Sequence, residues 1–317
     1  MSDAVAGTAT DAAPAPGPRH VDYAAPTSLG ARLGLFARDI KISHTVFALP
    51  FALLSTFLAA GGVPRTGVLV LILVCMVTAR TVAMAANRLL DARLDALNPR
   101  TAGRAIPSGQ LSAAFYFLVL SVCAAVFLVA TAAFWMLYRN PWPMTLALPV
   151  LLFLCAYPLL KRFTRVCHYY LGAALALAPV CAWLAVRADL AAPPLFMAAA
   201  VLCWTAGFDI IYACQDYRSD VECGVFSVPA KLGIGRALWV ARLTHVVCVA
   251  MLVALGLSSP ALGPLYYTGV AAAVVLLVVE HRLVRPDDLS KVNLAFFTYN
   301  GVISLVLGSL GIIDVFL

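Results

Sequence analysis

The chain has 317 residues, of which 63% are hydrophobic and 12% charged, and its mean hydropathy is +0.94. Soluble domains contain roughly 45 to 50% apolar residues, so this composition excludes an ordinary soluble protein. A net charge of +7 could indicate nucleic-acid binding in a soluble chain, but basic residues between apolar segments are typical of membrane proteins. We therefore expect the lipid bilayer as a partner and no nucleic acid.

The first part of the chain differs in composition from the rest. Residues 1–30 are rich in Ala, Pro, Gly and Thr, and they lack both the basic start and the apolar core of a secretory signal. Such a composition predicts disorder. We expect a disordered cytoplasmic tail over 1–30 and a transmembrane domain over 31–317.

About nine apolar stretches follow, each long enough to cross the bilayer as a helix. They are continuous and rich in Leu, Ala and Val, whereas the strands of a membrane barrel would alternate in short segments. The expected fold class is therefore an all-α integral membrane protein. The stretches cover residues 39–62, 66–90, 110–134, 143–160, 167–187, 195–215, 237–257, 264–283 and 293–313.

Basic residues are divided unequally between the two sets of connections. Most Lys and Arg lie in the N-terminal segment and after the second, fourth, sixth and eighth stretches, and the other side has only Arg65, Arg139 and Arg187. The positive-inside rule then places the N-terminus in the cytoplasm, and an odd number of spans places the C-terminus outside. We expect a multi-pass protein of the inner (cytoplasmic) membrane.

Acidic side chains gather at the cytoplasmic ends of two stretches. In the second stretch Asn87, Asp91 and Asp95 recur every four residues. A helix has about 3.6 residues per turn, so each step drifts by only about 40° and the three side chains form one polar stripe.

A second stripe follows in the sixth stretch, within the segment DIIYACQDYRSD. Asp209, Tyr212, Asp216 and Asp220 are spaced three, four and four residues apart. On one regular helix they would lie within an arc of about 80°. Glu222 lies beyond this stripe and is a doubtful member.

Neighbouring carboxylates repel each other, and more strongly where water is scarce. A cation would reverse the sign of this interaction, and oxygen ligands from carboxylates and an amide suit Mg²⁺, which usually takes further ligands from phosphates. Two facing stripes would bind a magnesium diphosphate between them. The alternative for either stripe alone is a solvated helix end, but ionisable groups in membrane segments usually serve function.

These residues resemble the UbiA superfamily of membrane prenyltransferases, whose motifs have the forms NxxxDxxxD and DxxxD with an upstream Asp and Tyr. The resemblance extends through KISHTVFALPFAL, NPRTAGRAIPSG, YPLLKRFT and NLAFFTYNG, and covers essentially everything after residue 30. It implies nine helices around a central cavity that opens toward lipid. Within the family, HTVFALPFA, NPRTAGR and GFDIIYACQD look most like the branch of 4-hydroxybenzoate polyprenyltransferases and their menaquinone-pathway relatives.

The resemblance implies Mg²⁺-dependent transfer of a polyprenyl group from polyprenyl diphosphate to an aromatic acid, most simply 4-hydroxybenzoate in ubiquinone biosynthesis. Asp91, Asp95, Asp216 and Asp220 would be the catalytic residues. The expected metal ligands are these four with Asn87 and Asp209. The expected substrate-binding residues are Asn87, Arg80, Arg100, Arg104, Tyr157, Lys161, Asp209, Tyr212 and Lys41.

Several roles stay open at this stage. Arg80 lies two turns before Asn87 and could bind the carboxylate of the acceptor or pair with an acid. Lys41 and His44 could approach the acceptor, although interfacial placement of Lys41 is equally compatible with the sequence. His168 is expected to be an interfacial anchor without chemistry, and Asn300 to make a helix-packing hydrogen bond.

Three other functions compete with this interpretation. A dihydroxynaphthoate acceptor, as in menaquinone biosynthesis, would use the same site. A transporter or proton pathway would place polar residues near the bilayer midplane, whereas the acids here lie at one membrane face. A soluble-type polyprenyl diphosphate synthase is incompatible with the apolar stretches.

Overall fold

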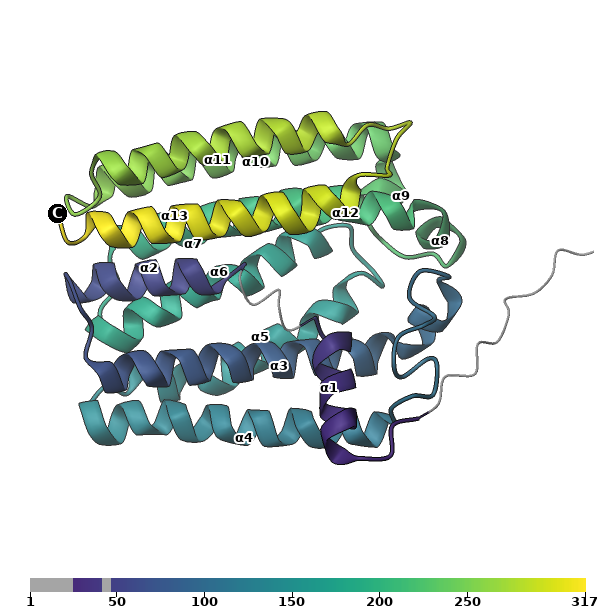
Figure 1. Ribbon diagram of the computed structural model, residues 1–317, viewed down its shortest axis with the longest axis horizontal. Coiled ribbons are helices and arrows are strands. Elements are labelled where there is room, and N and C mark those ends of the chain that lie inside the picture. The colour runs from purple at the N-terminus through teal and green to yellow at the C-terminus, as the bar shows by residue number, and fades with distance from the viewer. Residues whose placement is uncertain (1–24, 42–46) are drawn as a thin grey trace, which may run out of the picture.

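The computed structural model describes residues 25–41 and 47–317, and every element in these ranges is helical. The long helices run side by side along the length of the molecule, and α1 lies across them (Figure 1). The expectation of an all-α fold is confirmed. His44 and most of the predicted tail lie outside the described residues, and α1 begins at Leu29, within the last residues of that tail.

The first half of the fold contains the elements that carry the first acidic stripe. They are α1 (Leu29–Asp39), α2 (Leu49–Ala60), α3 (Thr66–Leu97), α4 (Ala113–Tyr138), α5 (Trp142–Leu160) and α6 (Cys167–Arg187). α3 continues past the predicted end at residue 90, so Asn87, Asp91 and Asp95 all project from one continuous helix.

The second half begins with the elements that carry the second stripe. They are α7 (Ala192–Ala213), the 3₁₀ turn η2 (Cys214–Asp216), α8 (Tyr217–Glu222), α9 (Val228–Leu232), α10 (Ile234–Ser258) and α11 (Pro264–Leu283). The chain ends with α12 (Val292–Leu294), a π-helical turn η3 (Ala295–Tyr299) and α13 (Asn300–Asp314). The C-terminus lies at the end of the molecule opposite α8 and α9 (Figure 1).

Eight helices of the described chain are long and apolar enough to cross a membrane, counting α7 to α8 and α12 to α13 as continuous rods. This is close to the expected number of about nine. The difference comes from the first predicted stretch, 39–62. Its described helix, α2, has only 12 residues and follows a separate helix, α1.

Hydroxyl groups and glycine mark several helix ends. The side chain of Ser112 accepts a hydrogen bond from Phe115 N at 3.2 Å and caps α4, and Ser28 caps α1 in the same way. Such caps satisfy amide groups that the helix itself leaves free. α2 ends at Gly61, whose φ of 61° is a left-handed conformation that glycine adopts without strain.

Close helix contact at a glycine positions part of the site. A Cβ atom on Gly172 of α6 would overlap the carbonyl of Leu202 in α7, so only glycine permits this approach. Small residues serve the same purpose in many membrane bundles. His168 lies one turn before Gly172, and the close packing brings its ring to α7.

A buried polar network ties the second half together, away from the acidic stripes. Trp204 Nε1 donates to Asn300 Oδ1 at 2.7 Å, and Asn300 Nδ2 donates to Glu280 Oε1 at 3.0 Å. The same amide donates to Ala295 O across the π-helical turn. The expected helix-packing role of Asn300 is therefore confirmed, and this network joins α7, α11 and α13.

Candidate active site

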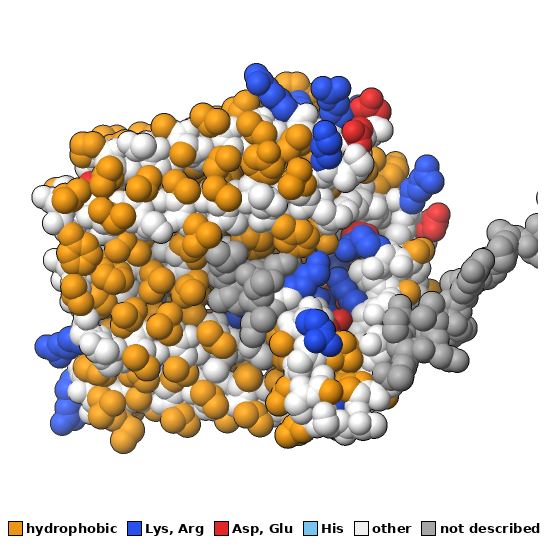
Figure 2. All heavy atoms as spheres, in the orientation of Figure 1, with side chains coloured by type: hydrophobic (Ala, Val, Ile, Leu, Met, Phe, Trp, Pro, Cys, Tyr) orange, Lys and Arg blue, Asp and Glu red, His pale blue; other side chains and the backbone are white. Residues whose placement is uncertain are grey.

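All of the predicted site residues line one cavity of about 460 Å³. This volume is within the range of ordinary ligand pockets, roughly 300 to 1,000 Å³. Hydrophobic side chains cover most of the face shown in Figure 2. Basic and acidic side chains gather toward the end where α8 and α9 lie, with a smaller basic group at the opposite end. The residues that line the cavity are charged at this end and mainly apolar elsewhere.

The first aspartate row, defined as Asn87, Asp91 and Asp95, projects from α3 into this cavity. The side chains of Asp91 and Asp95 are only 1% and 7% exposed. Asn87 Nδ2 donates to Asp91 Oδ2 at 3.1 Å, and Asn87 Oδ1 accepts from Arg88 Nη1 at 2.9 Å. Because a guanidinium can only donate, this contact fixes which end of the Asn87 amide faces Asp91.

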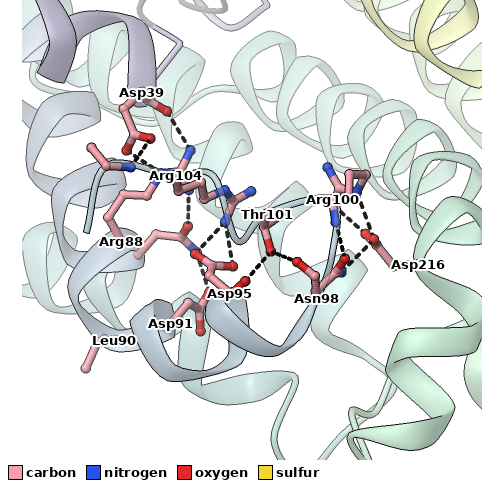
Figure 3. Close-up of polar contacts among 12 residues, drawn as sticks. Asp39, Arg88, Leu90, Asp91, Asp95, Asn98, Arg100, Thr101, Arg104 and Asp216 are labelled. Atoms are coloured by element: carbon pink, nitrogen blue, oxygen red, sulfur yellow. Dashed lines mark hydrogen bonds and ion pairs between the residues drawn. The ribbon is translucent and has the colours of Figure 1, made fainter. Parts of the chain in front are cut away.

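Cationic side chains from other elements neutralise this row. Lys161 Nζ, just after α5, lies 2.6 Å from Asp91 Oδ2, and Arg104 Nη1 donates to both oxygens of Asp95 at 2.7 Å. Arg104 belongs to the loop between α3 and α4. Figure 3 shows this loop folded back over α3, with Arg104 directed at Asp95.

The second aspartate row, defined as Asp209, Asp216 and Asp220, lies on α7, η2 and α8. A single regular helix was expected here, and the 3₁₀ turn at Cys214–Asp216 corrects that expectation. Three residues in 3₁₀ geometry add roughly 60° of rotation compared with an α-helix. The predicted narrow arc is therefore wider, and Asp216 and Asp220 contact different partners.

Asp216 joins the two rows. Its Oδ1 accepts from Asn98 Nδ2 at 2.9 Å and from Arg100 Nε at 2.8 Å, and Arg100 Nη2 lies 2.5 Å from Oδ2 (Figure 3). Arg100 also donates to the hydroxyl of Tyr212 at 3.1 Å. Asn98 and Arg100 follow α3 directly, so the loop after the first row binds the second row.

A hydroxyl group and an imidazole ring hold the other two acids of the second row. Asp220 Oδ2 accepts from Ser227 Oγ at 2.7 Å. His168 Nδ1 lies 2.7 Å from Asp209 Oδ2, and its Nε2 accepts from the backbone of Val228 at 3.2 Å. His168 therefore links Asp209 to the backbone at the start of α9.

His168 was expected to be an interfacial anchor, and the structure corrects this. The residue is 3% exposed and lines the cavity. Apolar residues and two tyrosines around it gave an interfacial pattern, but Gly172 allows α6 to approach α7 so closely that the ring contacts Asp209 instead. Glu222, the doubtful member of the second stripe, is exposed and does not line the cavity.

Sequence reasoning also missed Asp39. Its carboxylate accepts from Arg88 Nε at 3.0 Å, from the Tyr116 hydroxyl at 2.6 Å and from the backbone of Ala105 at 3.1 Å. Arg88 also donates to the carbonyl of Asp39. A single acid at the end of α1 gives no local sign of these long-range contacts.

Two further cations lie beside the aromatic part of the cavity. Arg80 Nη2 donates to the carbonyl of Lys41 at 3.2 Å, and among the described residues Arg80 Nε has no hydrogen-bond partner. Lys41 Nζ lies 4.7 Å from the centre of the Phe297 ring. Burial and the positive charges of Arg100, Arg104 and Arg88 lower the pKa of Lys41 to about 8.

The acidic rows fit a divalent cation that is bound together with a second molecule. Asp91 Oδ1 is buried and has no hydrogen-bond partner within the described part of the chain, and carboxylates are preferred ligands of Mg²⁺. Over the same residues, no three carboxylate, imidazole or thiol groups converge into a complete metal site. A cation here would therefore need oxygen ligands from its co-substrate, which is usual for Mg²⁺.

The described chain forms the all-α bundle of a multi-pass membrane protein. Its cavity is charged at one end and mainly apolar elsewhere, which suits an amphiphilic ligand. Residues 48–302 match the UbiA prenyltransferase family. The chain belongs to this family, which confirms the resemblance found in the sequence. It is therefore a membrane-embedded prenyltransferase.

The match to curated relatives extends over most of each relative's length. The chain is 31% identical over 261 residues to a 4-hydroxybenzoate octaprenyltransferase from Vibrio atlanticus, covering 81% of this chain and 88% of the relative. It is 32% identical over 248 residues to the enzyme of that name from Nitrosospira multiformis, covering 78% and 82%.

Solved structures share the architecture. The apo structure of a UbiA homologue from Aeropyrum pernix has a TM-score of 0.77 and 28% identity, covering 87% of this chain and 99% of that one. A UbiA homologue from Archaeoglobus fulgidus, bound to GPP and Mg²⁺, has a TM-score of 0.65 and 19% identity, covering 89% and 100%. The second likeness concerns the fold alone.

Proposed function

We propose that the chain transfers a polyprenyl group from a polyprenyl diphosphate to 4-hydroxybenzoate, in the biosynthesis of ubiquinone. The observation that carries this proposal is a single cavity with two acidic rows and their cations at one end and apolar walls beyond. The names of the matched relatives support the acceptor, and the GPP and Mg²⁺ bound to the Archaeoglobus homologue support the donor and the metal.

The apolar part of the cavity supports a long prenyl donor. Its lining residues on α3 run from Ile72 to Asp95, which corresponds to roughly 35 Å of helix at about 1.5 Å per residue. Phe127 and Phe134 of α4 and Leu146 of α5 line the same region. A prenyl chain there would lie along α3 with its diphosphate at the charged end.

The charged end would bind the diphosphate. Asp91, Asp95, Asp209, Asp216 and Asp220 would hold Mg²⁺, which when bound neutralises charge on the leaving diphosphate. Asn87, predicted to be a ligand, uses both ends of its amide within the protein and would orient Asp91.

Three cationic side chains that now neutralise the acids would bind phosphate oxygens in the occupied site. Lys161, Arg104 and Arg100 each pair with one aspartate. Diphosphate oxygens offer the same charge-assisted hydrogen bonds. Tyr157 and Tyr212 line the cavity beside these groups, and Tyr212 already receives a hydrogen bond from Arg100.

Arg80 supports an acceptor that carries a carboxylate. It lies in a largely apolar stretch of α3 and, within the described chain, no ion pair joins it to an acid. Burying a cation without an anion costs free energy. The carboxylate of a bound acceptor would supply that anion. Lys41 lies beside it, and Phe208 and Phe296 line the same part of the cavity.

The reaction assigned to these groups is an alkylation of an aromatic ring. The allylic C–O bond of the donor breaks and diphosphate leaves with both electrons. A ring carbon next to the acceptor hydroxyl forms the new C–C bond and then loses its proton. The chain's task is to place that carbon beside the allylic carbon, which alone can contribute several kcal/mol, roughly 7 to 11 in ideal cases.

The location that we propose for the enzyme is the inner membrane. The basic loops around the acidic rows support a cytoplasmic orientation of this end in the inner membrane, with residues 1–30 as a tail and 31–317 as the enzyme domain. The C-terminus, at the other end of the molecule (Figure 1), would then face outward.

The test uses purified protein in detergent with Mg²⁺, geranyl or longer prenyl diphosphates, and 4-hydroxybenzoate or dihydroxynaphthoates. We expect prenylated 4-hydroxybenzoate. A product with dihydroxynaphthoate alone would move the assignment to menaquinone biosynthesis. No product from any pair would contradict the proposal.

The variant Arg80→Met tests whether Arg80 binds the carboxylate of the acceptor. Loss of a hydrogen-bonded charge pair should raise the KM for 4-hydroxybenzoate roughly 10- to 100-fold, while the KM for the prenyl diphosphate changes little. Arg282→Met, which removes an exposed arginine at the end of α11, is the matched control. Equal effects of Arg80→Met on both substrates would remove Arg80 from the acceptor site.

A further inference from the structure

The contacts of Asp39 extend from the end of α1 to the first aspartate row without a break. Asp39 Oδ2 accepts from Arg88 Nε, Arg88 Nη1 donates to Asn87 Oδ1, and Asn87 Nδ2 donates to Asp91 Oδ2, at 3.0, 2.9 and 3.1 Å. Figure 3 shows Arg88 between Asp39 and the row. Asp91 is the acid whose second oxygen, Oδ1, is buried without a hydrogen-bond partner in the described chain.

Among the described residues, Arg88 differs from Lys161, Arg104 and Arg100 because it does not pair with an acid of either row. Its side chain is 4% exposed and its ion pair is with Asp39, whose side chain is 7% exposed. Yet Arg88 lines the cavity and precedes Asp91 by three residues on the same helix. Side chains three apart on a helix are neighbours, so Arg88 without Asp39 would turn to Asp91.

The guanidinium makes both contacts at once because its donors form a rigid fork. Nε and Nη2 bind Asp39, leaving Nη1 for the Asn87 oxygen. The Asn87 amide group that faces Asp91 is then the NH₂ donor. A lysine at this position could neutralise Asp39, but a single ammonium on a flexible stem does not reproduce the fork.

We propose that Asp39 and Arg88 are positioning residues for the metal-binding acids. Asp39 keeps the Arg88 charge away from Asp91, and Arg88 orients Asn87 so that its NH₂ group supports Asp91 Oδ2 and leaves Oδ1 for the cation. This inference rests on the proposed metal-diphosphate site. It adds a control of that site by α1, an element outside both acidic motifs.

The experiment measures Mn²⁺ binding by electron paramagnetic resonance, with the full-length protein in detergent and saturating geranyl S-thiolodiphosphate, an unreactive donor analogue that supplies the diphosphate oxygens. Asp39→Asn leaves Arg88 without its anion, so Arg88 becomes a competing cation at Asp91. We expect the Mn²⁺ concentration at half-saturation to rise about tenfold, in line with the loss of one charge-assisted contact. In Asp39→Asn/Arg88→Gln the competing charge is gone but the fork is lost as well, so half-saturation should fall back to the several-fold increase expected from loss of the fork alone.

Two further variants separate positioning from general stability. Arg88→Lys keeps a positive charge beside Asp39 but loses the fork, so half-saturation should rise several-fold in a folded protein; this variant also carries the test if Asp39→Asn does not survive purification. Tyr116→Phe removes one hydroxyl donor from Asp39 and leaves the ion pair. It should lower the melting temperature while half-saturation stays within about twofold.

The outcomes are distinguishable. Wild-type protein that binds no Mn²⁺ would contradict the proposed function itself. Wild-type binding that is unchanged in both Asp39→Asn and Arg88→Lys would overturn only the positioning roles. A double variant that binds Mn²⁺ as weakly as Asp39→Asn would overturn the idea that Arg88 competes for the acids.

Discussion

The two aspartate rows look alike in sequence but differ in how the fold neutralises them. In the first row Asp91 and Asp95 each pair with a cation, Lys161 and Arg104. In the second row Asp216 is the only acid that pairs with a Lys or Arg side chain of the described residues, namely Arg100. Asp209 has the imidazole of His168 as its partner, and Asp220 has the hydroxyl of Ser227.

This difference indicates that the two rows have different functions in substrate binding. The second row keeps more uncompensated negative charge, so it should contribute more of the attraction for a divalent cation. The first row carries the cations that would turn to phosphate oxygens when the diphosphate binds. Variants on either side of the cavity test this comparison.

The largest effect is expected from Asp91→Asn in the first row. It removes the charge of an acid that is 1% exposed and contacts Lys161. Lost stabilisation of several kcal/mol corresponds to a decrease in kcat of about 10³-fold or more. Steady-state kinetics measure it, with Asp287→Asn on the exposed loop after α11 as control. Near-normal turnover in Asp91→Asn would place the chemistry elsewhere.

Lys161→Met tests whether the cations of the first row bind the donor. The KM for prenyl diphosphate should rise roughly 10- to 100-fold, since one charge-assisted hydrogen bond is lost. Arg165→Met removes an exposed cation from the same loop and should change this KM by less than about twofold. If both variants behaved alike, Lys161 would be only a membrane anchor.

Variants of His168 test whether its hydrogen bond supports Asp209 in the second row. His168→Ala removes the donor to Asp209 and should lower kcat/KM for the prenyl diphosphate about tenfold. His168→Asn retains an N–H donor close to the position of Nδ1 and should recover most of the activity. Failure of the asparagine variant to exceed the alanine variant would show that ring packing, not the hydrogen bond, matters.

The smallest effect is expected from Lys41, and it depends on pH. Burial and the charges of Arg100, Arg104 and Arg88 lower its pKa to about 8, against the opposing effect of Asp39. Below pH 8 the ammonium is charged and attracts an anionic acceptor, and above pH 8 this attraction is lost. The kcat/KM for 4-hydroxybenzoate should therefore fall several-fold as pH rises through about 8.

Lys41→Gln is the matched control for this pH dependence. It removes the titrating group, so the decrease near pH 8 should disappear and activity at low pH should already equal the reduced level. The profile of kcat/KM for the prenyl diphosphate, measured in the same series, should show no such change. A decrease near pH 8 that persists in Lys41→Gln would assign it to another group.

Local patterns were sufficient to predict the eight long apolar helices of the described chain and the first row. α3 is one regular helix, so the spacing of Asn87, Asp91 and Asp95 determined their common face. The second row obeyed the same spacing, but the 3₁₀ turn at Cys214–Asp216 changed its arc. That turn lies where Asp216 binds the loop after α3, and such a contact leaves no periodic signal in the sequence.

The missed residues act over long distances along the chain. Asp39 pairs with Arg88 of α3 and with Tyr116 of α4, and nothing near position 39 predicts either partner. His168 needed the close approach of α6 and α7 at Gly172, which is a property of packing. Asn98 belongs to a motif that the sequence did highlight, but its contact with Asp216 required the folded loop.

The most direct test of the central claim asks whether both rows bind one metal and diphosphate together. Mn²⁺ binding can be measured by electron paramagnetic resonance with geranyl S-thiolodiphosphate, an unreactive donor analogue, in wild-type protein, Asp91→Asn and Asp216→Asn. We expect the analogue to strengthen Mn²⁺ binding in wild type and either substitution to abolish this gain. Full strengthening in either variant would show that its row does not share the ligand.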